Sequence, residues 1–60
     1  MKAVRILIAD DHAIVRRGIR ALLELQRGWK ICGESATGKE AVAQAKRLMP
    51  DVAILDVSMP

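Results

Sequence analysis

Apolar residues form three short runs along the chain, separated by two longer stretches with a helical period. The runs Val4–Ala9 and Asp51–Leu55 are strongly apolar, and only Arg5 interrupts the first. Such runs are typical of strands covered on both faces, as in parallel sheets. Residues Trp29–Glu34 instead alternate between two faces, which indicates a half-exposed strand at a sheet edge. One face of this strand would carry Trp29, Ile31 and Gly33.

The stretch from Ala13 to about Gln26 is predicted to be an amphipathic helix. Its apolar residues recur at i, i+4, i+7 and i+8, and charged residues occupy the other side. Asp11 is placed to cap the start, and Gly28 just beyond the end breaks the helix. The apolar positions are Val15, Ile19, Leu22 and Leu23.

A second helix is predicted between the last two strands, beginning with a capping box. Thr37 and Glu40 are three residues apart, so each side chain should accept a hydrogen bond from the backbone N–H of the other. The helix should end at Pro50, whose ring disfavours helical geometry in the residue before it. Its apolar positions are Ala41, Val42, Ala45 and Leu48.

The order strand, helix, strand, helix, strand is the βαβ alternation that builds a parallel α/β sheet. If the alternating strand lies at the edge, the strand order is 2-1-3. The chain then leaves the first strand in opposite directions. This arrangement creates a crevice at the carboxyl ends of the first and third strands, where sheets of this kind bind ligands.

Three carboxylates are predicted to meet at that crevice. Asp10 and Asp11 follow the first strand, and Asp56 follows the third. Like charges this close repel one another unless a cation lies among them, and all-oxygen ligation suits Mg²⁺ or Mn²⁺. A carboxylate beside such a cation can also act as a nucleophile toward a phosphoryl group. The alternative is that the pair caps a helix and that Asp56 is a turn residue.

Composition limits the classes of protein to consider. Sixty residues make one small domain, and 52% hydrophobic with 28% charged residues is typical of a globular chain. The single cysteine, Cys32, cannot form an internal disulfide, which favours the reducing cytoplasm. The N-terminal apolar run is too short for a signal sequence or a membrane span, so no membrane association is expected.

The net charge of +3 raises the alternative of a nucleic-acid surface. Trp29 is the only aromatic residue, so no stacking platform accompanies the charge, and we favour a solvated helix face. The basic residues concerned are Arg16, Arg17, Arg20 and Arg27.

Two further features compete with the carboxylates as sites. Residues 33–40 nearly match the phosphate-binding pattern GxxxxGK[ST], but Glu40 stands where a hydroxyl should bind Mg²⁺. His12 adjoins the acidic pair and could be a ligand or a base, although an exposed residue that only tunes the site is the simpler interpretation.

The segments ILIADDHAIVRRGIRALLE, GWKICGESATGKEAV and PDVAILDVSMP closely resemble the amino-terminal part of a response-regulator receiver domain. The resemblance is to NarL/FixJ-type two-component transcriptional regulators, and it implies the flavodoxin-like (CheY-like) fold. It covers the whole of residues 1–60 but only about the first half of such a domain, with the sequence ending before a fourth strand.

The resemblance also implies residue roles. Asp10 and Asp11 correspond to the acidic pair that holds Mg²⁺, with Asp11 favoured as the direct ligand, and Asp56 corresponds to the phosphoacceptor. Ser58 stands where the family offers a backbone carbonyl to the metal. The implied partner is a sensor histidine kinase. The implied role is that of a phosphoacceptor in signalling rather than of an enzyme.

Residues 1–60 lack other parts of the family pattern. The Ser or Thr after the fourth strand, the Lys after the fifth, the aromatic switch residue and the DNA-binding effector domain are all outside them, so DNA would be bound only through that effector domain. The second hypothesis is therefore a non-catalytic fragment that acts as an interaction module. It would form homodimers through the receiver or through an exposed strand edge. An unrelated phosphoryl-transfer enzyme is a third.

Overall fold

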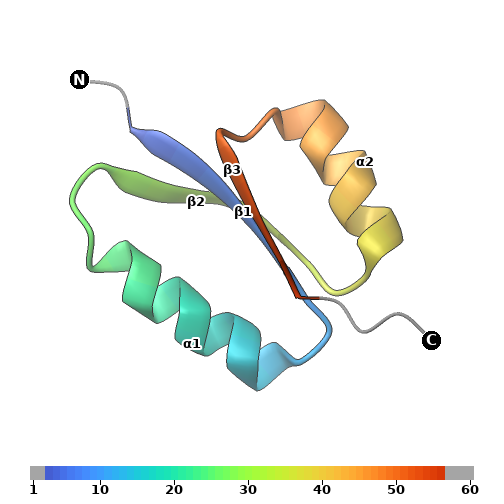
Figure 1. The fold of residues 1–60 in the computed structure, drawn as a ribbon, viewed down its shortest axis with the longest axis horizontal. Helices are drawn as coiled ribbons and strands as arrows, with labels where there is room; N and C mark the ends of the chain where they lie inside the picture. Colours follow the sequence, from blue (N-terminus) through green and yellow to red (C-terminus); the bar gives the residue numbers. More distant parts are fainter. Residues whose placement is uncertain (1–2, 57–60) are drawn as a thin grey trace.

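The computed structural model describes residues 3–56 as a three-stranded sheet with one helix on each side (Figure 1). The alternation of strands and helices predicted from the sequence is confirmed. The elements in chain order are β1 (Val4–Asp10), α1 (Ala13–Glu24), β2 (Trp29–Ser35), α2 (Gly38–Leu48) and β3 (Val52–Asp56).

The strands are parallel and lie in the order β2-β1-β3, which confirms the predicted topology. The central strand, β1, forms the core because it is covered by a strand on each side and a helix on each face. Its residues Ile6, Leu7, Ile8 and Ala9 are at most 3% exposed. Burying large apolar side chains such as these stabilises a fold by about 1.5–3 kcal/mol each.

β2 contains an extra residue that breaks the predicted alternation. Ile6 pairs with Ile31, but the next residue, Leu7, pairs with Gly33, so Cys32 bulges out of register. A Cβ at Gly33 would meet Leu7 and two side chains of α2, so this position faces α2. The expectation that Ile31 and Gly33 share a face was wrong, because the bulge turns the strand between them.

The start of α1 differs from the expected cap. His12, not Asp11, is the N-cap residue, and its side chain makes no capping hydrogen bond. Instead, the backbone N–H of His12 donates to Oδ1 of Asp10 at 2.8 Å. Asp11 is therefore not used as a cap. The helix ends at Glu24, slightly before the expected boundary, and Gly28 follows with a φ of 83°.

The capping box of α2 is present in half of its expected form. The Glu40 N–H donates to Thr37 Oγ1 at 3.1 Å, as predicted. The Glu40 carboxylate accepts from the Thr37 hydroxyl at 3.3 Å, where a bond from the Thr37 backbone was expected. The helix stops before Pro50 as predicted, with Met49 in the left-handed conformation at φ 49°.

Arg5, the only polar residue within the first apolar run, connects the end of α2 to β1 through hydrogen bonds. Its Nη1 donates to the carbonyl oxygens of Leu48 and Met49 at 2.6 and 3.2 Å. The backbones of Arg5 and Asp51 are also joined, because the Asp51 N–H donates to the Arg5 carbonyl at 2.8 Å. These contacts supply donors to carbonyls that a helix C-terminus leaves without partners.

Within the described residues, β3 pairs with β1 alone and leaves its other edge open. Val52 and Leu55 of β3 are 45% and 65% exposed. An apolar groove of about 330 Å³ lies between α2 and β3, and it is lined by Leu7, Gly38, Ala41, Val42, Ala45, Ala53 and Leu55. No helix within residues 3–56 is long and apolar enough to cross a membrane.

Candidate functional site

The carboxyl ends of β1 and β3 lie side by side, as the predicted topology requires. Asp10 and Asp56 are register partners at the last position of the β1–β3 ladder. Their exposure differs sharply, because Asp10 is 1% exposed whereas Asp56 is exposed. This end of the sheet therefore has one buried carboxylate and one that solvent can reach.

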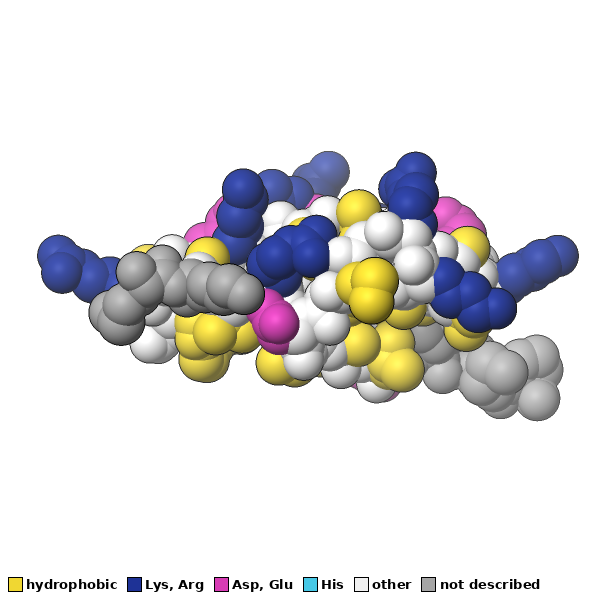
Figure 2. All heavy atoms as spheres, turned by 90° about the horizontal axis from the view of Figure 1, so that it is seen from above, with side chains coloured by type: hydrophobic (Ala, Val, Ile, Leu, Met, Phe, Trp, Pro, Cys, Tyr) yellow, Lys and Arg dark blue, Asp and Glu magenta, His cyan; other side chains and the backbone are white. Residues whose placement is uncertain are grey.

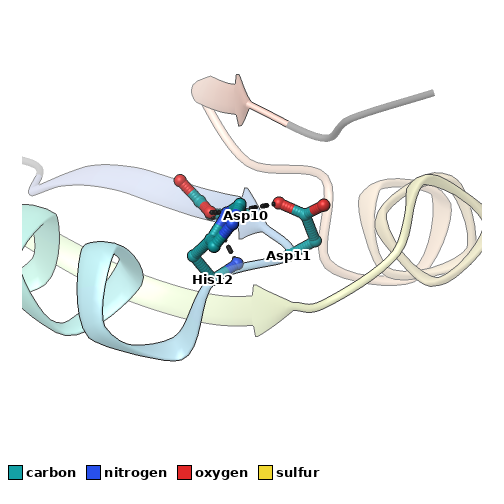
Figure 3. Close-up of side chains that lie close together, drawn as sticks. All are labelled: Asp10, Asp11 and His12. Atoms are coloured by element: carbon teal, nitrogen blue, oxygen red, sulfur yellow. Dashed lines mark hydrogen bonds and ion pairs between the residues drawn. The ribbon is translucent and has the colours of Figure 1, made fainter. Parts of the chain in front are cut away.

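Asp10, Asp11 and His12 form a compact group of ligand atoms (Figure 3). One atom from each of them lies within 4.8 Å of the others, and among the described residues Asp56 is not part of such a group. Nδ1 of His12 lies 2.9 Å from Oδ1 of Asp11 and 3.7 Å from Oδ1 of Asp10. The imidazole, which is 69% exposed, thus sits between the two carboxylates.

The second carboxylate oxygen of Asp10 is the unusual feature of this group. Oδ2 of Asp10 is buried and has no hydrogen-bond partner among the described residues. A buried acceptor without a partner costs about 1–3 kcal/mol, and an ionised one costs more. A hard cation bound here would remove that cost, so Asp10 and Asp11 fit the oxygen donors that Mg²⁺ prefers.

Arg16 contributes to this site, although the sequence analysis placed it on a solvated helix face. Its side chain is only 21% exposed, and Nη1 donates to the backbone carbonyl of Asp10 at 2.7 Å. Its Nε donates to Oε1 of Glu34 at 3.2 Å. The solvated interpretation was therefore wrong for Arg16, because Glu34 on β2 provides a partly buried partner that helical periodicity does not reveal.

Arg20 reaches the same glutamate from the next turn of α1. It pairs with Glu34 through Nη1 and with Glu24 through Nε at 3.4 Å. These carboxylates raise the pKa of Arg20, with the hydrogen bond to Glu24 the largest cause and that to Glu34 the next. Arg20 makes no hydrogen bond to Asp10 within the described residues, so it belongs to the edge of the network rather than to the site.

The remaining basic residues do not form one compact surface. Figure 2 shows Lys and Arg side chains spread along the whole length of one face, with hydrophobic side chains gathered below them. Arg17 and Arg27 are exposed. Because Trp29 is the only aromatic residue in the sequence, these basic side chains have no stacking platform beside them.

Other predicted positions lie away from the carboxyl ends of β1 and β3 or outside the described residues. Ser58, with the segment Met59–Pro60, falls among residues 57–60 and is not described. Within the P-loop-like segment, Thr37 and Glu40 are used for capping the helix. Cys32 is a half-buried free thiol at the bulge of β2.

Comparison with known proteins assigns the fold and the residues to one family. The sequence profile of the response regulator receiver domain matches residues 6–60. A protein-glutamate methylesterase/protein-glutamine glutaminase of Alkalilimnicola ehrlichii is 46% identical over 57 residues, which cover 95% of this chain and 15% of that protein. Response regulator GacA of Pseudomonas viridiflava is 40% identical over 95% of this chain and 27% of its own length.

A solved structure shows the same arrangement of elements. The signal receiver domain of the putative response regulator NarL from Mycobacterium tuberculosis superposes with a TM-score of 0.93 and 37% identity. It covers 100% of this chain, whereas this chain covers 48% of that domain. The chain thus spans about half of the receiver structure and a smaller part of the full-length relatives. The chain belongs to the response regulator receiver domain family of two-component signalling.

Proposed function

We propose that this chain accepts a phosphoryl group on Asp56 from a partner histidine kinase in a Mg²⁺-dependent reaction. The observation that carries the proposal is the pairing of Asp10 with Asp56. Asp10 is buried with a carboxylate oxygen that has no partner within residues 3–56, and its register partner on β3 is exposed. The same end of the sheet thus carries a carboxylate suited to a cation and a carboxylate suited to reaction.

The residues that would hold the metal are Asp10, Asp11 and Asp56, together with the backbone carbonyl of Ser58. Bound Mg²⁺ would supply charge neutralisation, which lets an anionic phosphoryl group approach a cluster of carboxylates. The described part of the site supports this donor set, because two of the three carboxylates already lie within 4.8 Å of one another. Mn²⁺ has similar ligand preferences and should substitute.

The chemical step uses the exposed carboxylate as the nucleophile. A carboxylate oxygen of Asp56 forms a bond to phosphorus while the bond from phosphorus to the imidazole nitrogen of a phosphohistidine breaks. The electron pair of the broken bond returns to that nitrogen, and an acyl phosphate forms on Asp56. The backbone of Asp56 is paired with β1 at the end of β3, and this pairing supports a nucleophile whose main chain is held in place.

Phosphoryl transfer from a small donor tests this function directly. Incubation with acetyl phosphate and Mg²⁺ should yield an acid-stable, base-labile adduct on Asp56. Asp56→Asn should abolish it, whereas Asp51→Asn should not, because Asp51 is an exposed aspartate beside the opposite end of β3. Unchanged labelling of the Asp56→Asn variant would contradict the proposal.

The wider role is proposed from the family. We infer that residues 1–60 form the amino-terminal half of a receiver domain in a transcriptional regulator. DNA would then be bound through an effector domain outside these residues. The sensor kinase would be met in the cytoplasm, a reducing compartment that the free thiol of Cys32 suits.

A second candidate function is self-association through β3. Within the described residues, the open edge of this strand presents exposed Val52 and Leu55, of which Leu55 lines the apolar groove, and such edges invite pairing with another chain. Sedimentation at micromolar concentration should then show a dimer, and Val52→Lys should weaken it. A monomer at all concentrations would exclude this function for residues 1–60.

A further inference from the structure

Arg16 joins three elements at the point where the acidic residues begin. It projects from α1, donates to the carbonyl of Asp10 at the end of β1, and pairs with Glu34 on β2. The β1–β2 ladder ends at Ala9–Ser35, so Asp10 lies one residue beyond it. Beyond the last backbone pair, the side chain of Arg16 therefore connects β1 to β2.

The contact acts on the backbone that carries the buried carboxylate. Asp10 is held through its carbonyl by Arg16 at 2.7 Å and through Oδ1 by the His12 N–H at 2.8 Å. The other carboxylate oxygen, Oδ2, is buried and has no hydrogen-bond partner in the described part of the chain. A planar guanidinium suits this task, because its several N–H groups can hold two acceptors at once in fixed directions.

We propose that Arg16 is a positioning residue of the metal site, fixing the backbone at Asp10 so that its carboxylate is preset for Mg²⁺. This inference rests on the proposed function, since it concerns the affinity of the same site. Groups that orient metal ligands from outside the coordination sphere change metal affinity by about 10–100-fold when removed. Arg16 contacts Asp10 through the backbone carbonyl and not through the carboxylate, so it would act on the metal site indirectly.

Arg20 provides a matched control on the same helix. Both arginines pair with Glu34, but only Arg16 contacts Asp10. Arg20 also pairs with Glu24, and its side chain is 47% exposed. Replacing either arginine removes one positive charge and one ion pair to Glu34, and only replacement of Arg16 should disturb the acidic residues.

The test is calorimetric titration of the folded protein with Mg²⁺, with unfolding measured in parallel. Arg16→Gln should weaken Mg²⁺ binding about tenfold, and Arg20→Gln should change it by less than about twofold. Arg16→Lys keeps the positive charge but loses the planar group that donates to two acceptors at once. It should weaken Mg²⁺ binding about threefold. If Arg16→Gln fails to fold, Arg16→Lys decides the question, and an affinity equal to that of the unaltered protein overturns the inference.

Hydrogen exchange gives a readout that a merely structural role would not change. The His12 amide donates to Oδ1 of Asp10. Relative to the unaltered protein, Arg16→Lys should speed the exchange of this amide more than the exchange of β1 amides such as that of Leu7. A uniform change across the sheet would overturn the inference by showing a general loss of stability. If the unaltered protein binds no Mg²⁺, the proposed function itself fails. If it binds Mg²⁺ and the Arg16 and Arg20 variants bind equally well, only the role of Arg16 is refuted.

Discussion

Asp10 and Asp56 lie side by side as the last pair of the β1–β3 ladder, and Asp10 is 1% exposed whereas Asp56 is exposed to solvent. Two residues of the same type at equivalent strand positions thus occupy opposite environments. The difference arises from topology, because β1 has a strand on each side whereas the described β3 has one. The proposed roles follow from this difference: the buried carboxylate of Asp10 binds the cation, and the exposed carboxylate of Asp56 reacts.

Asp10→Asn should stabilise the metal-free protein. The substitution removes a buried carboxylate with one oxygen that has no partner among residues 3–56, and the amide oxygen can still accept from the His12 N–H. We expect the free energy of unfolding in a chelator to rise by about 1 kcal/mol. Denaturant titration measures this.

The matched measurement adds Mg²⁺ to both proteins. A cation that binds only the folded state at one hundred times its Kd stabilises it by about 2.7 kcal/mol. The unaltered protein should gain stability in this way, and Asp10→Asn should not. Equal gains in both proteins would show that Asp10 is not a ligand.

Gly33→Ala should destabilise the fold through the contact between β2 and α2. A Cβ at Gly33 would lie 2.5 Å from Oε1 of Gln44 and 2.8 Å from Cδ1 of Leu48. Gln44 cannot move freely, because its Nε2 donates to the Glu34 carbonyl at 2.9 Å. We expect a loss of about 1–2 kcal/mol in thermal or chemical unfolding.

Gly18→Ala is the control for that substitution. Gly18 lies on the exposed side of α1, and a Cβ added there would meet no neighbouring atom within 4 Å. Alanine is the better helix former, so stability should rise by about 0.5–1 kcal/mol. A loss at Gly18 equal to that at Gly33 would argue against the specific contact.

Arg5→Met should loosen the end of α2. The variant keeps an unbranched apolar stem but removes the guanidinium that donates to the carbonyls of Leu48 and Met49. We expect a loss of about 2 kcal/mol in the free energy of unfolding. Arg17→Met, on an exposed position of α1, should change it by less than about 0.5 kcal/mol. Equal effects would contradict the role given to Arg5.

The strand order and the meeting of Asp10 with Asp56 could be predicted from the sequence, because both follow from periodicity and from the rules of parallel connections. Helix ends were also predictable where a local signal exists, as at Pro50 and Thr37. The two helix ends depend on residues that are close together in the chain, and the sequence displays such residues directly.

The bulge at Cys32 and the contacts of Arg16 could not be predicted in the same way. The bulge depends on how β2 settles against β1, and a shift of one residue leaves no mark in the composition of the strand. Arg16 looked solvated because helical periodicity assigns a face, not a partner. Glu34, a charged residue inside a predicted strand, was the available signal for that pairing.

Phosphoryl transfer to Asp56 tests the central claim most directly. The unaltered protein and its Asp56→Asn and Asp51→Asn variants would be incubated with a phosphodonor, with Mg²⁺ or with chelator, and the modified residue located by peptide mapping. The account predicts Mg²⁺-dependent modification of Asp56 in the unaltered protein and in Asp51→Asn, and none in Asp56→Asn. Modification that persists in Asp56→Asn, or that proceeds equally in chelator, would contradict it.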